Sequence, residues 1–470
     1  MYCASKLLII YLGINDNRRR NFMNTVDTIA AISTGTGGAI SIIRISGGKA
    51  LELLNSVWKG RETHGKHNSR KMILGKMISG GEPVLAVYMP GPNSYTGDDI
   101  AEIHCHGGSL SAKNALEKVL SAGARSAEPG EFTYRAFING KMDLTQAEAV
   151  ADIISAHSEM ALRLAEKQIS GLLKNSVDEI RNGLVNILAE CESRMDFPEE
   201  NLDWTDKNTL SEMIRDSRGK TEKLLLSRKE GIVLREGIRV VIAGKPNVGK
   251  SSLMNLLLGF DRAIVTKIPG TTRDTLEEFA NIRNIPVRLI DTAGIREAGD
   301  IIENMGINRS RAVIREAQIV VWMLDASSEN PEDESADMTK HIGNEKNIIA
   351  LWNKIDMMKN SSLPDTGFTS ASISIKNNSG MDSFLDIFEK TVWGYPHAQG
   401  PEVAVSSRHA SLLDEVLKEL PEAAEKVLSE DWELAASNLR SAVNALGKIT
   451  GQTADPDILE NIFSRFCIGK

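Results

Sequence analysis

The chain has 470 residues, of which 41% are hydrophobic and 25% are charged, a balance typical of a globular protein with about three domains. Its formal net charge of −8 argues against a protein that coats nucleic acid nonspecifically, but it permits a local basic site for one RNA. The four cysteines lie far apart and form neither a disulfide framework nor a paired zinc motif, so we expect a reducing, cytoplasmic compartment.

The first 22 residues contain an apolar stretch, "KLLIIYLGI", followed by "NDNRRR" where a signal peptide would carry a small-residue cleavage site. A membrane-spanning helix needs about 20 consecutive apolar residues, and the sequence has no such run. We therefore expect no export signal and no membrane span. Residues 1–22 are expected to be a flexible extension before Met23.

Residues 23–141 are expected to form an α+β domain with a polar binding face. In "DIAEIHCHGG", strand alternation separates a polar set from an apolar one: Glu102, His104 and His106 against Ala101, Ile103 and Cys105. Successive residues on one face are about 6.6 Å apart, so three ligands to one metal ion are awkward and a polar binding face is favoured. Arg44, Glu102 and Lys141 fit either a ligand site or surface ion pairs.

Long helices are predicted on both sides of the middle of the chain. From Thr145, apolar residues recur at spacings of three and four, which predicts one amphipathic stripe. Its members are Leu162, Ala165, Ile169, Leu172, Leu173, Val177, Ile180, Leu184, Ile187 and Leu188. Because the sequence after residue 392 has the same period, we expect residues 142–235 and 393–470 to form one helical domain into which residues 236–392 are inserted.

The middle segment carries a phosphate-binding loop. "RVVIA" reads as a buried strand that runs into "GKPNVGKSS", the G-x-x-x-x-G-K-[ST] pattern from Gly244 to Ser251. Glycines let backbone N–H groups surround phosphates, Lys250 supplies positive charge, and the Ser251 hydroxyl suits Mg²⁺. With strands and helices alternating, residues 236–392 are predicted to form a doubly wound parallel α/β domain.

Two further motifs select the nucleotide. "VRLIDTAG" ends in Asp291 and Gly294, an acid for Mg²⁺ and a backbone amide for the terminal phosphate. "NKID" offers Asp356 to the N1–H and N2 amine of guanine, whereas adenine would leave this carboxylate unpaired. GTP is therefore the predicted nucleotide. "SIK" from Ser374 to Lys376 is the expected last contact to the base, although "TSAS" at 369–372 competes for the same register.

The sequence predicts an unusual way of positioning the hydrolytic water. Ile295 stands where many small GTPases have a water-orienting glutamine. The preceding loop, "TKIPGTTRD", offers Thr272 as a second hydroxyl ligand for Mg²⁺ and backbone carbonyls for another cation. Its alternative interpretation is an ordinary surface loop.

Together these motifs resemble the MnmE (TrmE) family of tRNA-modification GTPases. The stretches "GKPNVGKSS", "IPGTTRD", "DTAGIRE", "EPGEFTYRAFINGKMDLTQAEAVAD" and "IFSRFCIGK" occur in the family's order, and the resemblance covers nearly all of Met23 to Lys470. It implies a K⁺-stimulated GTPase activated by pairing of G domains in a homodimer. With an FAD-dependent MnmG-like partner in a heterotetramer, such a protein modifies C5 of the wobble uridine of certain tRNAs.

The resemblance also assigns residues. Combined with the motifs, it implies a GTP-binding set of Gly244, Asn247, Val248, Gly249, Lys250, Ser251, Ser252, Thr266, Thr271, Thr272, Asp291, Thr292, Ala293, Gly294, Asn353, Lys354, Asp356, Ser374 and Lys376. Asn247, Thr266, Ile268 and Thr271 would bind K⁺, and Ser251 and Thr272 would bind Mg²⁺. Glu303 would orient the water through a bridging molecule. Arg44, Glu102, Lys141 and Lys470 would bind 5,10-methylene- or 5-formyl-tetrahydrofolate.

The chain ends in "FCIGK", with Cys467 at the spacing of a prenylation box. Ile468, Gly469 and charged Lys470 do not fit such a box, so prenylation is not expected. The resemblance implies that Cys467 acts in the modification, while the alternative is a structural terminus. Two other functions remain open: an Era-like ribosome-assembly or regulatory GTPase, and a folate-dependent transferase with an idle G domain.

Overall fold

The computed structural model describes residues 27–35, 37–78, 81–197, 203–259, 277–291, 314, 317–335, 347–358, 362–394, 403 and 405–470. The chain forms two compact units. The first comprises Met1–Glu148 with Thr450–Lys470, and the second comprises Ala149–Ile449. The predicted extension, residues 1–22, lies outside the described residues.

The first unit is built on a mixed seven-stranded sheet with the order β3-β4-β5-β6-β2-β1-β7. Its strands are β1 (Ile29–Ile32), β2 (Ile40–Ser46), β3 (Trp58–Gly60), β4 (Ile73–Met77), β5 (Pro83–Met89), β6 (Ile100–His106) and β7 (Arg125–Ser126). Helices α2 (Ala50–Val57) and α3 (Ser109–Ser121) bury their apolar faces in the same core as the inward residues of β2, β5 and β6. The predicted α+β class of this domain agrees with this architecture.

The sheet register confirms the alternation predicted for β6. Ala101, Ile103 and Cys105 are buried, while Glu102 lies opposite Arg44 of the antiparallel neighbour β2. The first unit also contains η1 (Lys66–Asn68), α4 (Glu131–Ile138) and α17 (Pro456–Phe463). Helix α5 (Leu144–Ser155) begins in this unit and continues into the second.

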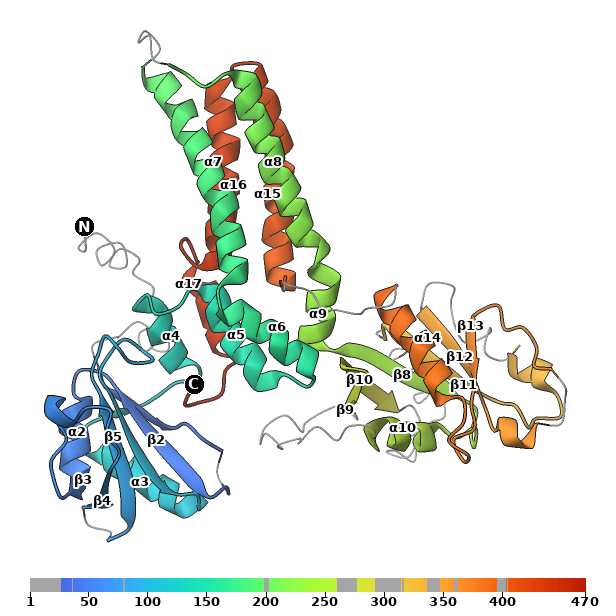
Figure 1. The fold of residues 1–470 in the computed structure, drawn as a ribbon, viewed down its shortest axis with the longest axis horizontal. Coiled ribbons are helices and arrows are strands. Elements are labelled where there is room, and N and C mark those ends of the chain that lie inside the picture. The colour runs from blue at the N-terminus through green and yellow to red at the C-terminus, as the bar shows by residue number, and fades with distance from the viewer. Residues whose placement is uncertain are drawn as a thin grey trace, which may run out of the picture. The chain divides into compact units, whose positions relative to one another are not determined.

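A helical bundle forms one part of the second unit. Its helices are α6 (Glu159–Ile169), α7 (Leu172–Asp196), α8 (Lys207–Leu226), α9 (Arg228–Glu236), α15 (Ser407–Leu428) and α16 (Trp432–Thr450). Residues of α7 and α8 share one core with residues of α15 and α16, although more than 150 residues of sequence separate the two pairs (Figure 1). Packing of the two distant helical segments on each other therefore agrees with the sequence pattern.

The single stripe predicted from Thr145 is wrong in one respect. The helix is interrupted after Ser155 and again at Gly171, whose φ of 89° starts α7 in a new direction. The interruption shifts the helical phase, so Ile169 and Leu172 are 36% and 40% exposed although the pattern placed them in the core. From Leu173 to Leu184 the buried positions follow the predicted spacing.

The other part of the second unit is an α/β domain with a six-stranded sheet in the order β13-β12-β11-β8-β10-β9. The strands are β8 (Ile238–Gly244), β9 (Glu277–Ile282), β10 (Ile285–Asp291), β11 (Ile319–Asp325), β12 (Asn347–Asn353) and β13 (Thr369–Ser372). All neighbours are parallel except the β9–β10 hairpin. The described helices are α10 (Lys250–Gly259), α14 (Met381–Trp393) and the short η2 (Ile355–Met357).

Both faces of this sheet are buried. Along β8, Val240 and Ile242 enter one core, whereas Val241 and Ala243 enter another. Such two-sided burial is typical of parallel sheets covered by helices. The predicted doubly wound α/β domain is thus what the described residues form, and its loops at the carboxyl ends of the strands carry the candidate site.

Candidate functional site

The phosphate loop connects the end of β8 to the start of α10, as predicted. Its backbone depends on glycine, because Gly244 and Gly249 have φ values of 137° and 104°. A Cβ at Gly244 would lie 2.3 Å from the Met323 carbonyl oxygen, and one at Gly249 would lie 2.5 Å from Asn353 Nδ2. The loop therefore exposes backbone N–H groups at a helix N-terminus, an arrangement that binds phosphates.

Lys250 and Asn247 lie within this loop. Lys250 Nζ donates hydrogen bonds to the carbonyl oxygens of Gly244 at 3.0 Å and Lys245 at 2.7 Å, so its charge is held over the loop. Asn247 adopts a left-handed conformation with a φ of 64°. Ser251 and Ser252 open α10 and are exposed.

A second group of contacts lies at the ends of β12 and β13. Asn353 Nδ2 donates to the Val248 carbonyl at 2.8 Å, and Asn353 Oδ1 accepts from the Ile375 amide at 3.2 Å. Ser374 Oγ donates to Asp356 Oδ1 at 2.6 Å. The structure thus brings the phosphate loop, Asp356 and the loop after β13 together, as the motifs require. "TSAS" forms β13, and "SIK" follows it as a loop that includes exposed Lys376.

Lys354 lies next to these contacts, directly after β12. Its φ is 65°, and its Nζ donates to Asp325 Oδ2 at 2.6 Å. Burial alone would raise the pKa of Asp325, but hydrogen bonds from Lys354 and Ser327 outweigh it and lower that pKa. The ionised carboxylate therefore holds the lysine stem at the edge of the site.

Several predicted residues lie outside the described residues. They are Thr266, Ile268, Thr271, Thr272, Thr292, Ala293, Gly294, Ile295 and Glu303. Asp291 ends β10, and only its backbone is described. Of the predicted ligands for K⁺ and Mg²⁺, Asn247 and Ser251 are the described ones.

A polar cluster lies on the sheet of the first unit. Arg44 Nε donates to Glu102 Oε1 at 2.9 Å, and His104 Nε2 lies 3.2 Å from Glu102 Oε2. Burial would raise the pKa of Glu102, but its hydrogen bonds with His104 and Arg44 lower it below its usual value. The cluster presents an ionised carboxylate beside a guanidinium, both partly buried, which suits a ligand with donor and acceptor edges.

His106 does not join this cluster. Its Nδ1 lies 2.8 Å from Glu82 Oε1, and Ser111 Oγ bonds to the same carboxylate. Within the described ranges, no group of three or more His, Cys, Asp or Glu side chains is placed to hold a metal ion.

Two aromatic rings border the cluster, and the two lysines predicted to join it lie in the same unit. The Arg44 guanidinium lies 5.7 Å from the ring of Tyr95 and 5.8 Å from that of Phe132. Lys141 is exposed, and its side chain passes Gly97, where an added Cβ would lie 3.3 Å from Lys141 Cγ. The Lys470 carbonyl accepts a hydrogen bond from the Phe132 amide at 3.2 Å. Arg44 and Glu102 are therefore in contact, and Lys470 joins them through Phe132.

Cys467 is a free, exposed thiol close to α4, whereas Cys105 and Cys191 are buried. Its carbonyl accepts from the Gly130 amide at 3.5 Å. The residues before it are anchored by aromatic contacts, since the Phe463 ring lies 5.3 Å from that of Tyr134 and 5.6 Å from that of Phe466. Tyr134 thus packs against the ring of Phe463.

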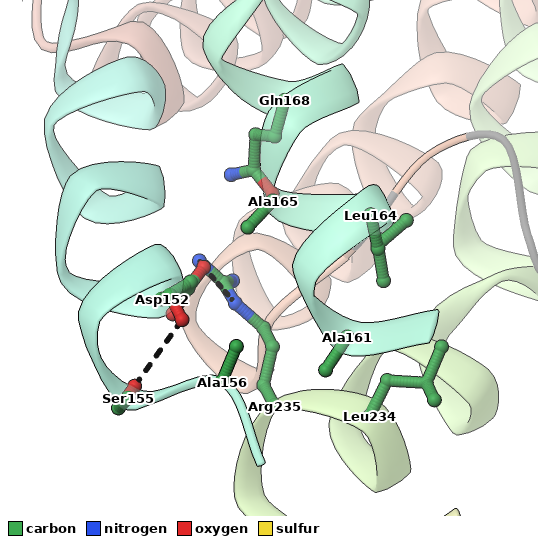
Figure 2. Close-up of a pocket in the computed structure, with 9 residues that line it drawn as sticks. All are labelled: Asp152, Ser155, Ala156, Ala161, Leu164, Ala165, Gln168, Leu234 and Arg235. Atoms are coloured by element: carbon green, nitrogen blue, oxygen red, sulfur yellow. Dashed lines mark hydrogen bonds and ion pairs between the residues drawn. The ribbon is translucent and has the colours of Figure 1, made fainter. Parts of the chain in front are cut away.

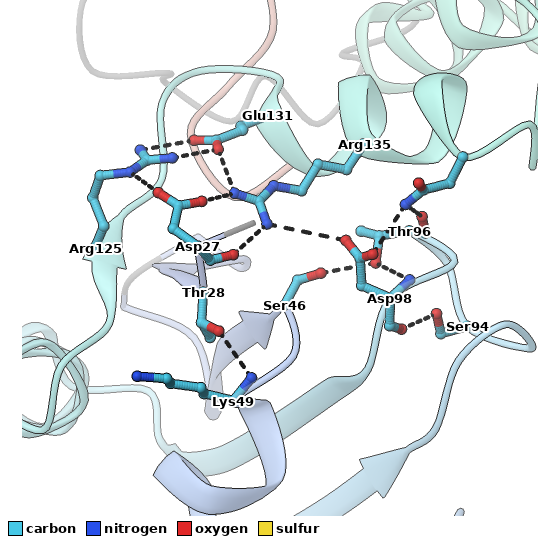
Figure 3. Close-up of polar contacts among 11 residues, drawn as sticks. Asp27, Thr28, Ser46, Lys49, Ser94, Thr96, Asp98, Arg125, Glu131 and Arg135 are labelled. Carbon is cyan, nitrogen blue, oxygen red and sulfur yellow. Dashed lines mark hydrogen bonds and ion pairs between the residues drawn. The ribbon is translucent and has the colours of Figure 1, made fainter. Parts of the chain in front are cut away.

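Sequence reasoning missed a charged network beside this site (Figure 3). Asp27 accepts from Arg125 at 2.6 Å and from Arg135 at 2.5 Å, and Glu131 accepts from both arginines. Burial raises the pKa of Asp27, but its bonds to Arg125 and Arg135 outweigh that effect and lower it. The available signal in the sequence was the spacing of Glu131 and Arg135, opposite charges one helical turn apart in "EFTYR". In the structure their side chains are only 2% and 1% exposed. The network fixes α4 to the sheet.

The second unit contains a small enclosed pocket between α5, α6 and α9 (Figure 2). Arg235 Nε donates to Asp152 Oδ2 at 2.6 Å on its wall. Its free volume of about 10 Å³ is at the limit for a single water molecule. We therefore interpret it as a packing gap.

None of the helices in the described ranges combines the length and apolarity that a membrane crossing requires.

Comparisons with known proteins cover nearly the whole chain. A family model described as the MnmE helical domain matches residues 144–467, and one described as the GTP-binding protein TrmE N-terminus matches residues 28–141. A relative from Natranaerobius thermophilus, named tRNA modification GTPase MnmE, is 40% identical over 459 residues, covering 95% of this chain and 100% of the relative. A relative of the same name from Geobacter sulfurreducens is 43% identical over 460 residues, with the same coverage.

A solved structure, the G domain of the T. maritima FeoB iron transporter, is 23% identical, with a TM-score of 0.25. It covers 33% of this chain and 98% of its own. A TM-score of 0.25 is too low to assign a property of that structure to this chain.

Proposed function

This chain belongs to the MnmE family of tRNA modification GTPases, and on that premise we propose that it is a GTP hydrolase that modifies C5 of the wobble uridine of certain tRNAs. The product would be an aminomethyl or carboxymethylaminomethyl group. An FAD-dependent, MnmG-like protein would act with it, and a reduced folate would supply one carbon.

In this proposal the α/β domain binds and hydrolyses GTP. Backbone N–H groups between Gly244 and Ser252 surround the phosphates, except at Pro246, which has none, and Lys250 neutralises their charge. Asp356 accepts two hydrogen bonds from guanine, while Asn353, Lys354, Ser374 and Lys376 complete the base site. The contacts of Asn353 with Val248 and Ile375 support this assignment, because they connect the phosphate loop to the loop after β13, which is proposed to contact the base.

Two cations complete the proposed reaction. Mg²⁺ would be held by Ser251 and Thr272, near Asp291, and K⁺ by Asn247 with Thr266, Ile268 and Thr271. A cation beside the transferred phosphoryl group stabilises the charge that develops there, as an arginine finger does. Thr292, Ala293 and Gly294 would meet the terminal phosphate, and Glu303 would orient water.

The first unit would bind 5,10-methylene- or 5-formyl-tetrahydrofolate through Arg44, Glu102, Lys141 and Lys470. The group fits the residues present, since the ionised Glu102 can accept from the amino-pyrimidine edge of a pterin, and Arg44 can donate to its carbonyl. When bound, the folate supplies a methylene carbon. The chain's own residues orient it, and the exposed thiol of Cys467 lies on the C-terminal side of the same unit.

The assembly we propose is a homodimer whose G domains pair, joined to the FAD protein in a heterotetramer that acts on tRNA in the cytoplasm. The observation that supports the whole proposal most is that one chain contains both the Asn353–Val248 hydrogen bond, beside the phosphate loop, and the Arg44–Glu102 ion pair, on the sheet of the first unit. An Era-like GTPase would need the first and would have no use for the second.

Mass analysis of wobble nucleosides in a strain that lacks the protein tests this proposal. We expect the modified uridine to disappear, to return with the wild-type chain, and to stay absent with Lys250→Ala. Cys467→Ser is expected to restore GTPase activity but no modification. Normal levels of modified uridine in the deletion strain would refute the proposal.

A further inference from the structure

Two different donors hold the two oxygens of the Glu102 carboxylate. Arg44 Nε lies 2.9 Å from Oε1, and His104 Nε2 lies 3.2 Å from Oε2. The proposed folate site takes Arg44 and Glu102 as ligand contacts but gives His104 no part. Because His104 contacts the oxygen that Arg44 does not, it controls the other half of the carboxylate.

His104 is the donor in its contact with Glu102. The pKa of Glu102 lies below its usual value, so the carboxylate is ionised at neutral pH and can only accept hydrogen bonds. The proton of the neutral imidazole must therefore lie on Nε2. In the sheet register, His104 stands between Ile42 of β2 and Leu85 of β5, whose side chains neither donate nor accept. The contact with Glu102 thus decides which tautomer of the ring is present.

The carboxylate keeps acceptor positions for a ligand. An ionised carboxyl group offers about four of them, two on each oxygen. Its hydrogen bonds within the described part of the chain come from Arg44 to Oε1 and from His104 to Oε2, which leaves one position on each oxygen. The side chains of Arg44, Glu102 and His104 are 22%, 13% and 19% exposed, so a ligand can reach them.

A donor on each oxygen fixes the plane of the carboxylate. The terminal torsion of a glutamate side chain rotates over a broad range, and a donor to Oε1 alone would leave much of that rotation open. The second donor, His104, confines it. A ligand that binds across both oxygens then loses less side-chain entropy when it orders the carboxylate.

We infer that His104 is a positioning residue, which holds Glu102 so that the open acceptor position on each oxygen meets a ligand with two adjacent N–H donors. The amino-pyrimidine edge of a reduced pterin is a group of this kind, so the inference rests on the proposed folate site for the identity of the ligand. In this role His104 changes ligand affinity through Glu102.

Calorimetric titration with 5-formyl-tetrahydrofolate at pH 7 tests this role. His104→Leu removes the donor and should weaken binding about fivefold, the usual effect of one lost hydrogen bond. His104→Gln can donate through its amide and should stay within about twofold of the wild type. If His104→Leu does not fold, His104→Ala removes the same donor. Wild-type affinity in the folded variant, or equal weakening in His104→Gln, would overturn the inference.

His106→Leu is the matched control. His106 lies two residues further along β6, on the same face of the strand, but its Nδ1 lies 2.8 Å from Glu82 Oε1. The substitution also removes an imidazole, yet it leaves the donors to Glu102 in place. Folate affinity should therefore stay within about twofold of the wild type. Weakening equal to that in His104→Leu would show that the contact with Glu102 is not what matters.

The pH dependence of binding separates positioning from a general loss of structure. Burial raises the pKa of Glu102, and the hydrogen bond from His104 is the largest effect that lowers it, ahead of the charge of Arg44. Among the described residues these two are the ionisable groups in contact with Glu102, and β5 contributes Val87 opposite it. Without His104 the pKa should rise, so affinity should fall at a higher pH in His104→Leu than in the wild type. Coincident acid limbs would overturn the inference.

A titration without ligand separates this inference from the folate proposal. Carbon NMR of protein labelled at the glutamate carboxyl groups reads the pKa of Glu102, whose signal is assigned by its absence in Glu102→Gln. This pKa should be higher in His104→Leu and unchanged in His106→Leu. Absence of folate binding by the wild type would reject the ligand alone, whereas an unchanged pKa of Glu102 in His104→Leu would overturn the role of His104.

Discussion

At the scale of single residues, Glu102 is the acid whose protonation matters most for the proposed folate site. Its bonds with Arg44 and His104 lower its pKa from the usual 4.5 despite burial. A lowered pKa in the folded state stabilises the fold above about pH 4.5, and this contribution is lost as the pH falls through the folded-state value. Glu102→Gln should therefore cost about 1 to 3 kcal/mol at pH 7, the usual effect of an unpaired buried group.

Urea unfolding of both proteins at pH 7 and at pH 3.5 measures this effect. The difference between wild type and Glu102→Gln should shrink at the lower pH, because below about pH 4.5 the unfolded wild-type chain takes up a proton at this carboxyl that the folded chain disfavours. Glu62→Gln, at an exposed position in the same unit, should change the unfolding free energy by less than about 0.5 kcal/mol. An equal difference at both pH values would contradict the ionised Glu102.

Asn247 is the described member of the proposed K⁺ site, held in a left-handed conformation at the phosphate loop. In the proposal, Ile295 stands where many GTPases orient water with glutamine, and the cation would stabilise the charge that develops in the transition state. GTP turnover should be at least tenfold faster in K⁺ than in Na⁺, and Asn247→Ala should abolish that difference. Steady-state phosphate release at saturating GTP and constant ionic strength is the measurement. Equal rates in the two salts would exclude this role.

At the scale of elements, Asn353 joins three pieces of the α/β domain. It ends β12, binds the phosphate loop through Val248 and binds the loop after β13 through Ile375. Asn353→Ala should weaken GTP binding at least tenfold and destabilise the domain by about 1 to 3 kcal/mol, because the buried Val248 carbonyl and the half-buried Ile375 amide lose their partner.

The matched control is Asn347→Ala at the exposed start of the same strand. Calorimetric titration with a non-hydrolysable GTP analogue should give wild-type affinity for this control. Wild-type affinity in Asn353→Ala as well would show that the two loops are positioned independently of Asn353.

Elements with a local signature could be predicted from the sequence. The phosphate loop and the alternation in β6 depend on residues close together in the chain, so spacing alone revealed them. The exposed Ile169 and Leu172 show the limit, because the pattern continued through Gly171 while the backbone turned there. The Asp27–Arg135 contact joins residues 108 positions apart. The hydrogen bond from the Phe132 amide to the Lys470 carbonyl joins residues even further apart in the sequence. Neither contact produces a periodic pattern that the sequence alone could reveal.

At the scale of the whole second unit, the helical part and the α/β domain share one core. Ala161 and Leu164 of α6 and Val233 of α9 belong to the same buried cluster as Val240 of β8 and Leu289 of β10. His157, which precedes α6, stacks on Phe279 of β9 with ring centroids 4.4 Å apart. Helix α6 should therefore unfold together with the α/β domain, whereas the core shared by α7, α8, α15 and α16 is separate.

Leu164→Ala tests this shared core. Truncating a buried leucine costs about 2 to 5 kcal/mol, and here the loss should fall on the α/β domain although the substitution lies in a helix outside it. In scanning calorimetry, the transition that a GTP analogue shifts upward identifies that domain, and Leu164→Ala should lower the same transition. Ile187→Ala, in the separate core of the bundle, should lower a different one. Ile169→Ala, on the exposed side of α6, should leave both within about 0.5 kcal/mol. If Leu164→Ala left the GTP-sensitive transition unchanged, α6 would pack against that domain without stabilising it. Helix α6 would then not couple nucleotide binding to the helical bundle.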